Sequence, residues 1–381
     1  MRPFHAVVVA YTAILASACA GSSTAASPGQ GPNPAPVPPI VSQEQQRAIT
    51  APLVPTTWPI RTKEHVDLWL HSYALLTADT TFVPYFRRGY RERMNTVRRQ
   101  RNVSSLIDTN KGKLLDGILR QPSLATSGQF LPLYFASWEQ MKQVIEMFVR
   151  NNGNPGNSND PNLRAYFGLL GAAFANVNDR EWLRMFTEAA DDENRRFYDA
   201  YWTAESKSHA MIVARTDSLW QRQWRPQLQR FLNNTQQQNG ELYLSFPLGG
   251  EGRTVHFGKA DNAVAGPMPD NNSETENVLY VFAHEVTGAI ASGAIADNTT
   301  PADQRAGVTS RYEQVAAVRA GAMLLERAFP NAVPGYMRYY LLAAGRTPPT
   351  DPKAMFISTF SLPDAIRDAL VRQFDTILGG I

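Results

Sequence analysis

The sequence predicts a mainly helical fold with one small antiparallel β-sheet, an α+β arrangement. Three observations support this. Apolar residues recur at helical spacing over most of the chain from Trp58 to Leu378. A single stretch, Gly240–Pro267, instead alternates apolar and polar residues around glycine-rich turns, which is typical of two or three antiparallel strands. Helical spacing resumes after that stretch, so the sheet is expected to lie between two helical lobes.

The overall composition is that of an ordinary globular protein. Of the 381 residues, 43% are apolar and 19% are charged, and the formal net charge is +3. So small a net charge gives no support to nucleic acid or to a polyanion as a partner. Without the two N-terminal segments described next, about 320 residues remain, which is enough for two packed lobes.

Residues 1–18 have the features of a signal peptide. Arg2 is followed by an apolar run, Phe4–Leu15, which is too short to cross a bilayer. Small residues then precede Cys19, the only cysteine in the sequence. This arrangement resembles a bacterial lipobox, in which the cysteine is lipidated, and the sequence therefore predicts an exported protein anchored to a membrane of the bacterial cell envelope. The alternative is an ordinary secretory cleavage site that leaves Cys19 as a free thiol.

Residues 19–57 are predicted to tether the folded part to the membrane. The segment Gly21–Pro39 is rich in glycine, serine and alanine and then in proline, so it can bury little apolar surface. The folded part is predicted to begin near Trp58, with one lobe over residues 58–239 and a second over residues 240–381.

The first lobe is predicted to be helical throughout. Pro226 should kink or split the last helix, and Met211, Trp220 and Trp224 are interpreted as core residues. Seven arginines lie between Phe86 and Arg101. A solvated helix face is the favoured interpretation of these arginines, and a patch for an anionic surface is the alternative. The predicted helices are Thr62–Ala78, Phe86–Arg101, Lys113–Arg120, Phe130–Val149, Leu163–Ala175, Asp179–Thr187, Glu193–Arg215 and Asp217–Leu232.

The second lobe contains the most informative stretch of the sequence. After the strands, Glu276–Ser292 is predicted to be one helix with His284 and Glu285 at its centre. These two residues match the start of the pattern H-E-x-x-H, in which two histidines one helical turn apart bind zinc and the glutamate acts as a base. The position of the second histidine is occupied by Gly288, which cannot be a ligand. Further helices are predicted over Thr309–Phe329, Gly335–Ala344 and Pro363–Leu378.

Two features near His284 extend this pattern. Glu313 lies 25 residues after Gly288, on the next predicted helix. Small residues on that helix, which are Ala316, Ala317, Ala320 and Gly321, should let it approach the His-Glu helix closely.

Over about residues 240–330, the order of strands, His-Glu helix and glutamate helix resembles the gluzincin class of zinc peptidases. The resemblance implies a zincin-like core between the two lobes. It implies that His284 and Glu313 bind zinc, that Glu285 activates water, and that a peptide or protein substrate lies along the strands. Gly288 departs from the family pattern. A substitute ligand is sought in His256, within the stretch Arg253–Gly258, or in Asp303.

Three functions remain open at this point. The first is a divergent zinc-dependent hydrolase, most simply a peptidase. The second is a catalytically inactive descendant that serves as a binding or scaffold lipoprotein of the envelope, with His284 packed in a helix interface and bonded to a carboxylate such as that of Glu313. The third is a carrier that holds a soluble ligand in a large apolar cleft between the lobes.

Overall fold

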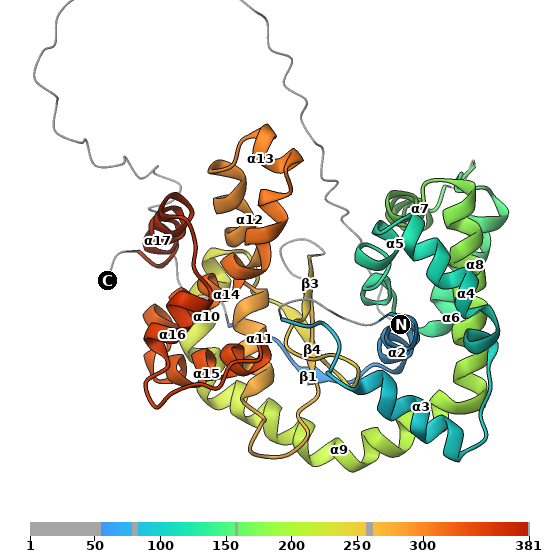
Figure 1. Ribbon diagram of the computed structural model, residues 1–381, viewed down its shortest axis with the longest axis horizontal. Coiled ribbons are helices and arrows are strands. Elements are labelled where there is room, and N and C mark those ends of the chain that lie inside the picture. The colour runs from blue at the N-terminus through green and yellow to red at the C-terminus, as the bar shows by residue number, and fades with distance from the viewer. Residues whose placement is uncertain (1–54, 78–82, 157–158, 257–261, 380–381) are drawn as a thin grey trace, which may run out of the picture.

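The computed structural model describes residues 55–77, 83–156, 159–256 and 262–379, and Figure 1 shows its arrangement. It confirms a mainly helical chain with one small sheet. The predicted signal peptide, Cys19 and all of the tether before residue 55 lie outside the described residues.

The sheet has four strands in the order β1-β2-β4-β3. They are β1 (Ile60–Arg61), β2 (Gly240–Ser245), β3 (Arg253–His256) and β4 (Asn262–Pro267). Strands β1, β2 and β4 are parallel to one another, and β3 alone of these four runs antiparallel, beside β4. The prediction of an antiparallel sheet was therefore wrong for two of the three strand pairs.

The segment between β2 and β3 explains this difference. It does not turn back on β2 as a hairpin would. Instead, the backbone amide of Gly249 donates to the Tyr85 carbonyl oxygen at 2.6 Å, and the amide of Gly250 donates to the Pro84 carbonyl oxygen at 2.9 Å. The chain thus crosses to the far edge of the sheet, and β4 returns between β3 and β2.

Each face of the sheet is covered by a different hydrophobic core. Leu242, Leu244 and Val264 point into the core of the C-terminal lobe. Tyr243 and Ala265, their neighbours along the two strands, point into the core of the N-terminal lobe. This alternation follows from the two-residue period of a strand. Both faces are buried, as expected for a largely parallel sheet.

The N-terminal lobe packs helices against one face of the sheet (Figure 1, right). Its elements are α2 (Glu64–Leu76), α3 (Tyr90–Gln100), α4 (Leu106–Arg120), α5 (Ser123–Thr126), η1 (Leu131–Tyr134), α6 (Trp138–Arg150), α7 (Pro161–Ala173) and α8 (Val177–Glu193).

A continuous helical run joins the two lobes and passes beneath the sheet in Figure 1. It continues from α8 through a π-helical turn, η2 (Asn194–Tyr198), into α9 (Asp199–Leu219), then through a second π-helical turn, η3 (Trp220–Trp224), into α10 (Arg225–Asn234). Pro226 lies at the start of α10, directly after η3. A π-turn at this point accommodates the missing proline N–H without ending the run.

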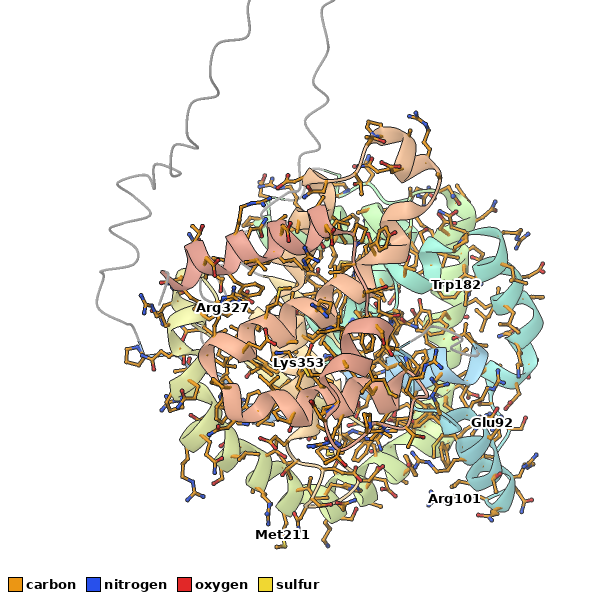
Figure 2. All side chains as sticks on the ribbon, turned by 60° about the vertical axis from the view of Figure 1, so that its left-hand side comes forward. Glu92, Arg101, Trp182, Met211, Arg327 and Lys353 are labelled. Atoms are coloured by element: carbon orange, nitrogen blue, oxygen red, sulfur yellow. The ribbon has the colours of Figure 1, made fainter. Side chains whose placement is uncertain are left out.

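Two predictions about this run can be compared with the structure. Trp220 and Trp224 are fully buried, so their interpretation as core residues is confirmed. The interpretation of Met211 as a core residue was wrong, because its side chain is 78% exposed on the outer side of α9 (Figure 2). Of the residues of α9, only Tyr201 and Thr216 are buried, as is typical of a helix that bridges two lobes through solvent.

The C-terminal lobe packs helices against the other face of the sheet. Its core also takes up Trp58 and the apolar side of α10, so residues that precede position 240 contribute to this lobe. Its other elements are α11 (Asn277–Glu285), α12 (Gly288–Asp297), α13 (Pro301–Arg305), α14 (Val308–Ala328), η4 (Pro330–Ala332), α15 (Val333–Ala343), α16 (Lys353–Thr359) and α17 (Asp364–Leu378).

Among the described residues, no single helix is both long enough and apolar enough to cross a membrane. The pair α11 and α12, which meet at an angle of 41°, has the required length and apolar character only when the two helices are counted together.

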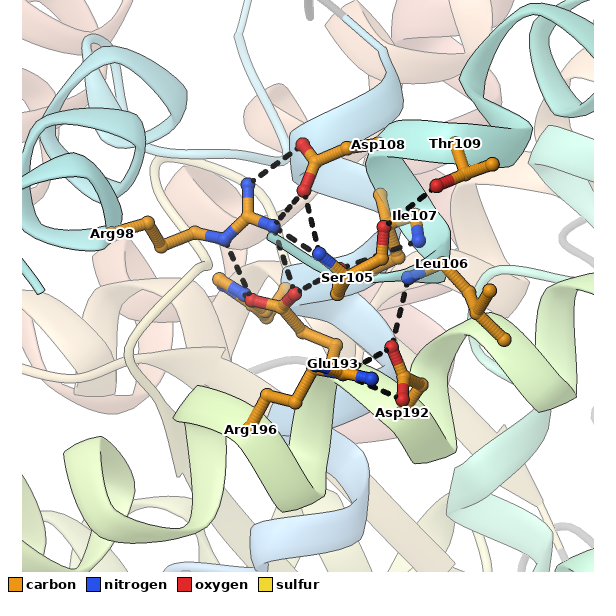
Figure 3. A network of polar contacts seen from close by, with 10 residues as sticks. Arg98, Ser105, Leu106, Ile107, Asp108, Thr109, Asp192, Glu193 and Arg196 are labelled. Atoms are coloured by element: carbon orange, nitrogen blue, oxygen red, sulfur yellow. Dashed lines mark hydrogen bonds and ion pairs between the residues drawn. The ribbon is translucent and has the colours of Figure 1, made fainter. Parts of the chain in front are cut away.

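A buried polar network ties three helices of the N-terminal lobe together (Figure 3). Arg98 on α3 forms an ion pair with Glu193 at the end of α8 at 3.0 Å and another with Asp108 on α4 at 2.6 Å. Ser105, the N-cap of α4, donates to the same Glu193 carboxylate. The side chains of Arg98 and Glu193 are 5% and 0% exposed. Arg98 therefore has a structural role, unlike a solvated arginine.

We expect Arg98→Met to destabilise the fold by about 3–5 kcal/mol, because it leaves part of a buried carboxylate cluster without its cation. Arg99→Met is the matched control. Arg99 is the exposed neighbour of Arg98, and its loss should change stability by less than about 0.5 kcal/mol. Denaturant unfolding of both variants measures the difference. Equal effects of the two substitutions would contradict the role given to the network.

Candidate metal centre

His284 and Glu285 lie at the C-terminal end of a helix, where a single continuous helix was expected. Helix α11 ends at Glu285, and α12 begins at Gly288 after a bend. The Thr287 hydroxyl donates to the His284 carbonyl oxygen at 2.7 Å, a local bond that competes with the helical pattern. Because the helix bends here, Gly288 is not placed one regular turn above His284, and a Cβ added to Gly288 would meet nothing within 4 Å.

A third acidic residue completes a cluster around His284. Glu251, from the loop before β3, places Oε2 3.2 Å from His284 Nε2, and Glu285 Oε1 lies 3.5 Å from the same nitrogen. One ligand atom from each of the three residues can be chosen so that all lie within 4.8 Å of one another. On the far side, the Thr254 hydroxyl of β3 donates to Glu285 Oε2 at 3.0 Å.

The cluster is almost completely removed from solvent. The side chains of His284, Glu251 and Glu285 are 3%, 7% and 9% exposed. Two glycines, one beside Glu285 and one beside His284, allow this close packing. A Cβ on Gly252 would lie 3.1 Å from Glu285 Cγ, and a Cβ on Gly321 would overlap the Tyr336 hydroxyl and lie 3.1 Å from His284 Cα. The close approach of α14 that its small residues predicted is therefore present at His284.

Burial and mutual charge set the protonation of the cluster. Burial opposes the charged imidazolium of His284, but the Glu251 and Glu285 carboxylates act together against burial, and the pKa of His284 is raised. The Ala317 carbonyl on α14 also raises the pKa of His284. Burial raises the pKa of Glu285, although the charge of His284 partly opposes this. Both residues thus hold protons more tightly than the same side chains in water.

Tyrosines of α15 close the inner side of the cluster. The Tyr340 ring lies 5.4 Å from the His284 ring, centre to centre, and the Tyr336 hydroxyl donates to the Val318 carbonyl oxygen at 2.8 Å. Burial raises the pKa of Tyr340 well above its ordinary value, so its hydroxyl stays protonated and remains a donor.

The residues present fit a divalent cation. Glu251 Oε1 is buried and has no hydrogen-bond partner among the described residues. The cluster brings two buried carboxyl groups to one imidazole, and Arg253 is a further cation that acts on Glu285. One nitrogen and two carboxylate oxygens are donors that zinc accepts in proteins. His284, Glu251 and Glu285 are therefore the described residues that could hold a metal ion together.

The other predicted site residues lie apart from this cluster. Glu313 is exposed on α14, one helical turn before Ala317, and is not a member of the cluster. Asp303 is half-buried and forms a capping box with Thr300 at the start of α13. The backbone of His256 pairs with Asn262 in the sheet, and its side chain lies outside the described residues.

Sequence reasoning missed Glu251. It lies in Gly249-Gly250-Glu251-Gly252, one of the glycine-rich turns of the predicted strand region, which was expected to be a hairpin turn. The sequence feature that could have identified it is a single acidic residue between glycines, directly before a predicted strand. This strand belongs to the region that resembles the zinc peptidases.

Comparison of the chain with models of protein families, with curated proteins and with solved structures found no significant match.

We expect Gly321→Ala to destabilise the protein by about 1–3 kcal/mol, because the added methyl group overpacks the contact between α14, His284 and Tyr336. Gly288→Ala is the matched control, because a Cβ at this position would meet nothing within 4 Å. It should stabilise the protein by about 0.4–1 kcal/mol, because alanine lowers the conformational entropy of the unfolded chain. Denaturant unfolding gives both values. Tolerance of Gly321→Ala would show that the approach of the two helices does not constrain the site.

Proposed function

We propose that the protein is a divergent metal-dependent hydrolase of the cell envelope that acts on peptides. The observation that carries the proposal is the buried cluster of Glu251, His284 and Glu285. In this proposal His284 and Glu251 bind zinc, and Glu251 takes the place that the resemblance to gluzincins assigned to Glu313. Glu285 remains the base.

The position of Glu285 supports its assignment as the base. Thr254 donates to Oε2, which fixes the carboxylate and leaves Oε1 directed toward His284 Nε2, at 3.5 Å. Burial raises the pKa of Glu285, which brings it closer to the range in which a carboxylate exchanges protons efficiently near neutral pH. Glu285 would take the proton of the attacking water and deliver it to the leaving amine. A divalent cation, when bound, would polarise the carbonyl group under attack.

The sheet edge supports a peptide as the substrate. Within the described residues β3 pairs with β4 and forms the edge of the sheet. Its residue Thr254 contacts Glu285 directly. An extended peptide that adds to such an edge would run past the base, which is the arrangement implied by the resemblance to gluzincins.

The decisive test is metal content together with hydrolysis. We expect about one zinc per chain in protein purified without chelator, and its loss in His284→Ala and Glu251→Gln. Glu285→Gln should keep the metal and lower peptide hydrolysis by about 10²–10⁴-fold, because the base is removed and the ligands remain. Elemental analysis and a peptide-library assay measure the two quantities. Full activity in Glu285→Gln would exclude the mechanism.

A second candidate function is a non-catalytic binding or scaffold lipoprotein. The observation that favours it is the burial of the cluster, since a catalytic zinc site needs an open position for water and substrate. If this candidate is correct, the unaltered protein and all of these variants should contain no zinc. The ion pair between His284 and Glu251 would then have only a structural role in the packing of the core. Absence of metal from the unaltered protein would favour this candidate.

We also propose that Cys19 carries a lipid that anchors the protein to a membrane of the envelope. Cys19→Ser should then move the protein from the membrane fraction to the soluble fraction of cells, because the substitution removes the thiol to which the lipid would be attached. Fractionation and immunoblotting measure the distribution. A soluble unaltered protein would favour the secretory cleavage site, and retention of Cys19→Ser in the membrane fraction would contradict the lipid as the anchor.

A further inference from the structure

A cleft of about 460 Å³ lies beside the candidate metal centre. Its walls come from residues 84–93, from Leu248, Gly249 and Gly250, from the loop after β4 and from the end of α15. The volume falls in the range of small-molecule sites. The residues that line the cleft do not include Glu251, His284 or Glu285, but Gly249 and Gly250 of its wall directly precede Glu251 in the sequence.

Three arginines line the cleft, and among the described residues only Arg87 of the three forms an ion pair with a carboxylate. Arg87 is engaged, since it forms an ion pair with Asp270 and its Nε donates to the Leu248 carbonyl oxygen at 3.0 Å. Arg88 donates one N–H to the Ala343 carbonyl oxygen at 2.9 Å. Arg93 is exposed and lies 5.5 Å from the Tyr90 ring centre. A guanidinium group has five N–H donors, so Arg88 and Arg93 can still bind an anion.

The charge and lining of the cleft indicate the kind of anion. Asp270 and Glu274 also line it, so three arginines against two acids leave one net positive charge. A single charge suits a carboxylate better than a doubly charged phosphate. The rest of the lining includes Leu248, Met268 and Leu342, which suits an apolar group attached to the carboxylate. The carrier hypothesis requires a large apolar cleft, whereas this cleft is lined partly by charged residues.

The cleft is coupled to the candidate centre through one tyrosine. Tyr339 lines the cleft, and its hydroxyl donates to the Gly249 carbonyl oxygen at 3.2 Å, two residues before Glu251. Its ring lies 5.1 Å from that of Tyr340, which lies against His284. A ligand in the cleft would therefore contact the loop that holds Glu251.

We propose that this cleft binds the free carboxylate of a peptide whose C-terminal side chain is apolar. The assignment of this peptide as the substrate rests on the hydrolase function proposed above, whereas the binding itself requires no metal.

The test uses the full chain after removal of metal with a chelator. Isothermal titration with N-acetyl-alanyl-leucine is compared with titration of its C-terminal amide and of inorganic phosphate. We expect the free acid to bind about tenfold more tightly than the amide and more tightly than phosphate, because charge-assisted bonds to Arg88 and Arg93 require a carboxylate.

The double variant Arg88→Gln/Arg93→Gln should lose about tenfold in affinity for the acid. Arg372→Gln, at an exposed arginine of α17 outside the cleft, should lose none.

Several results would overturn the assignment. These are equal affinity for the acid and the amide, tighter binding of phosphate, no measurable binding of the acid, or full affinity in the double variant. Because metal is removed beforehand, selective binding of the acid supports the cleft assignment even if the untreated protein contains no zinc and the hydrolase proposal fails.

Discussion

The close packing of α14 against α11 is the contact on which the candidate site depends. Gly321 leaves no room for a Cβ between α14 and His284, and the Tyr336 hydroxyl occupies the adjoining space. This contact fixes the backbone at the end of α11, where the chain bends. His284 is then held with its Nε2 toward Glu251 and away from bulk solvent. A larger residue at Gly321 would therefore move the imidazole itself.

The loop between β2 and β3 connects the sheet, the cluster and the cleft. Gly249 and Gly250 pair with residues 84 and 85 of the N-terminal lobe, which carries the chain across the sheet. A Cβ at Gly249 would lie 3.0 Å from the backbone of Phe86, so only glycine fits comfortably at this approach. The same loop delivers Glu251 to His284 and forms a wall of the arginine-lined cleft. One backbone path thus joins the two lobes at the site.

The sequence predicted local features better than long-range ones. Periodicity located the longer helices and three of the four strands, because it is a local property. The short helices α5, α13 and α16 and the two-residue strand β1 were not predicted. The direction of the strands depended on where the loop after β2 crosses, which involves residues 84 and 85, far away in the sequence. Glu251 was missed for the same reason, since it meets His284 only through the fold. Met211 was misassigned because its helix bridges two lobes, and apolar character alone does not show this.

The two buried acidic clusters differ in how their carboxylates are paired. In the N-terminal lobe both oxygens of Glu193 are bound, Oε1 by His71 at 3.2 Å and Oε2 by Arg98 at 3.0 Å. That cluster contains its own permanent cation. Around His284 the two carboxylates share one imidazole, and Glu251 Oε1 has no partner among the described residues. In the proposed metal site, the Glu251 oxygen without a partner among the described residues is the atom that a bound cation would pair with.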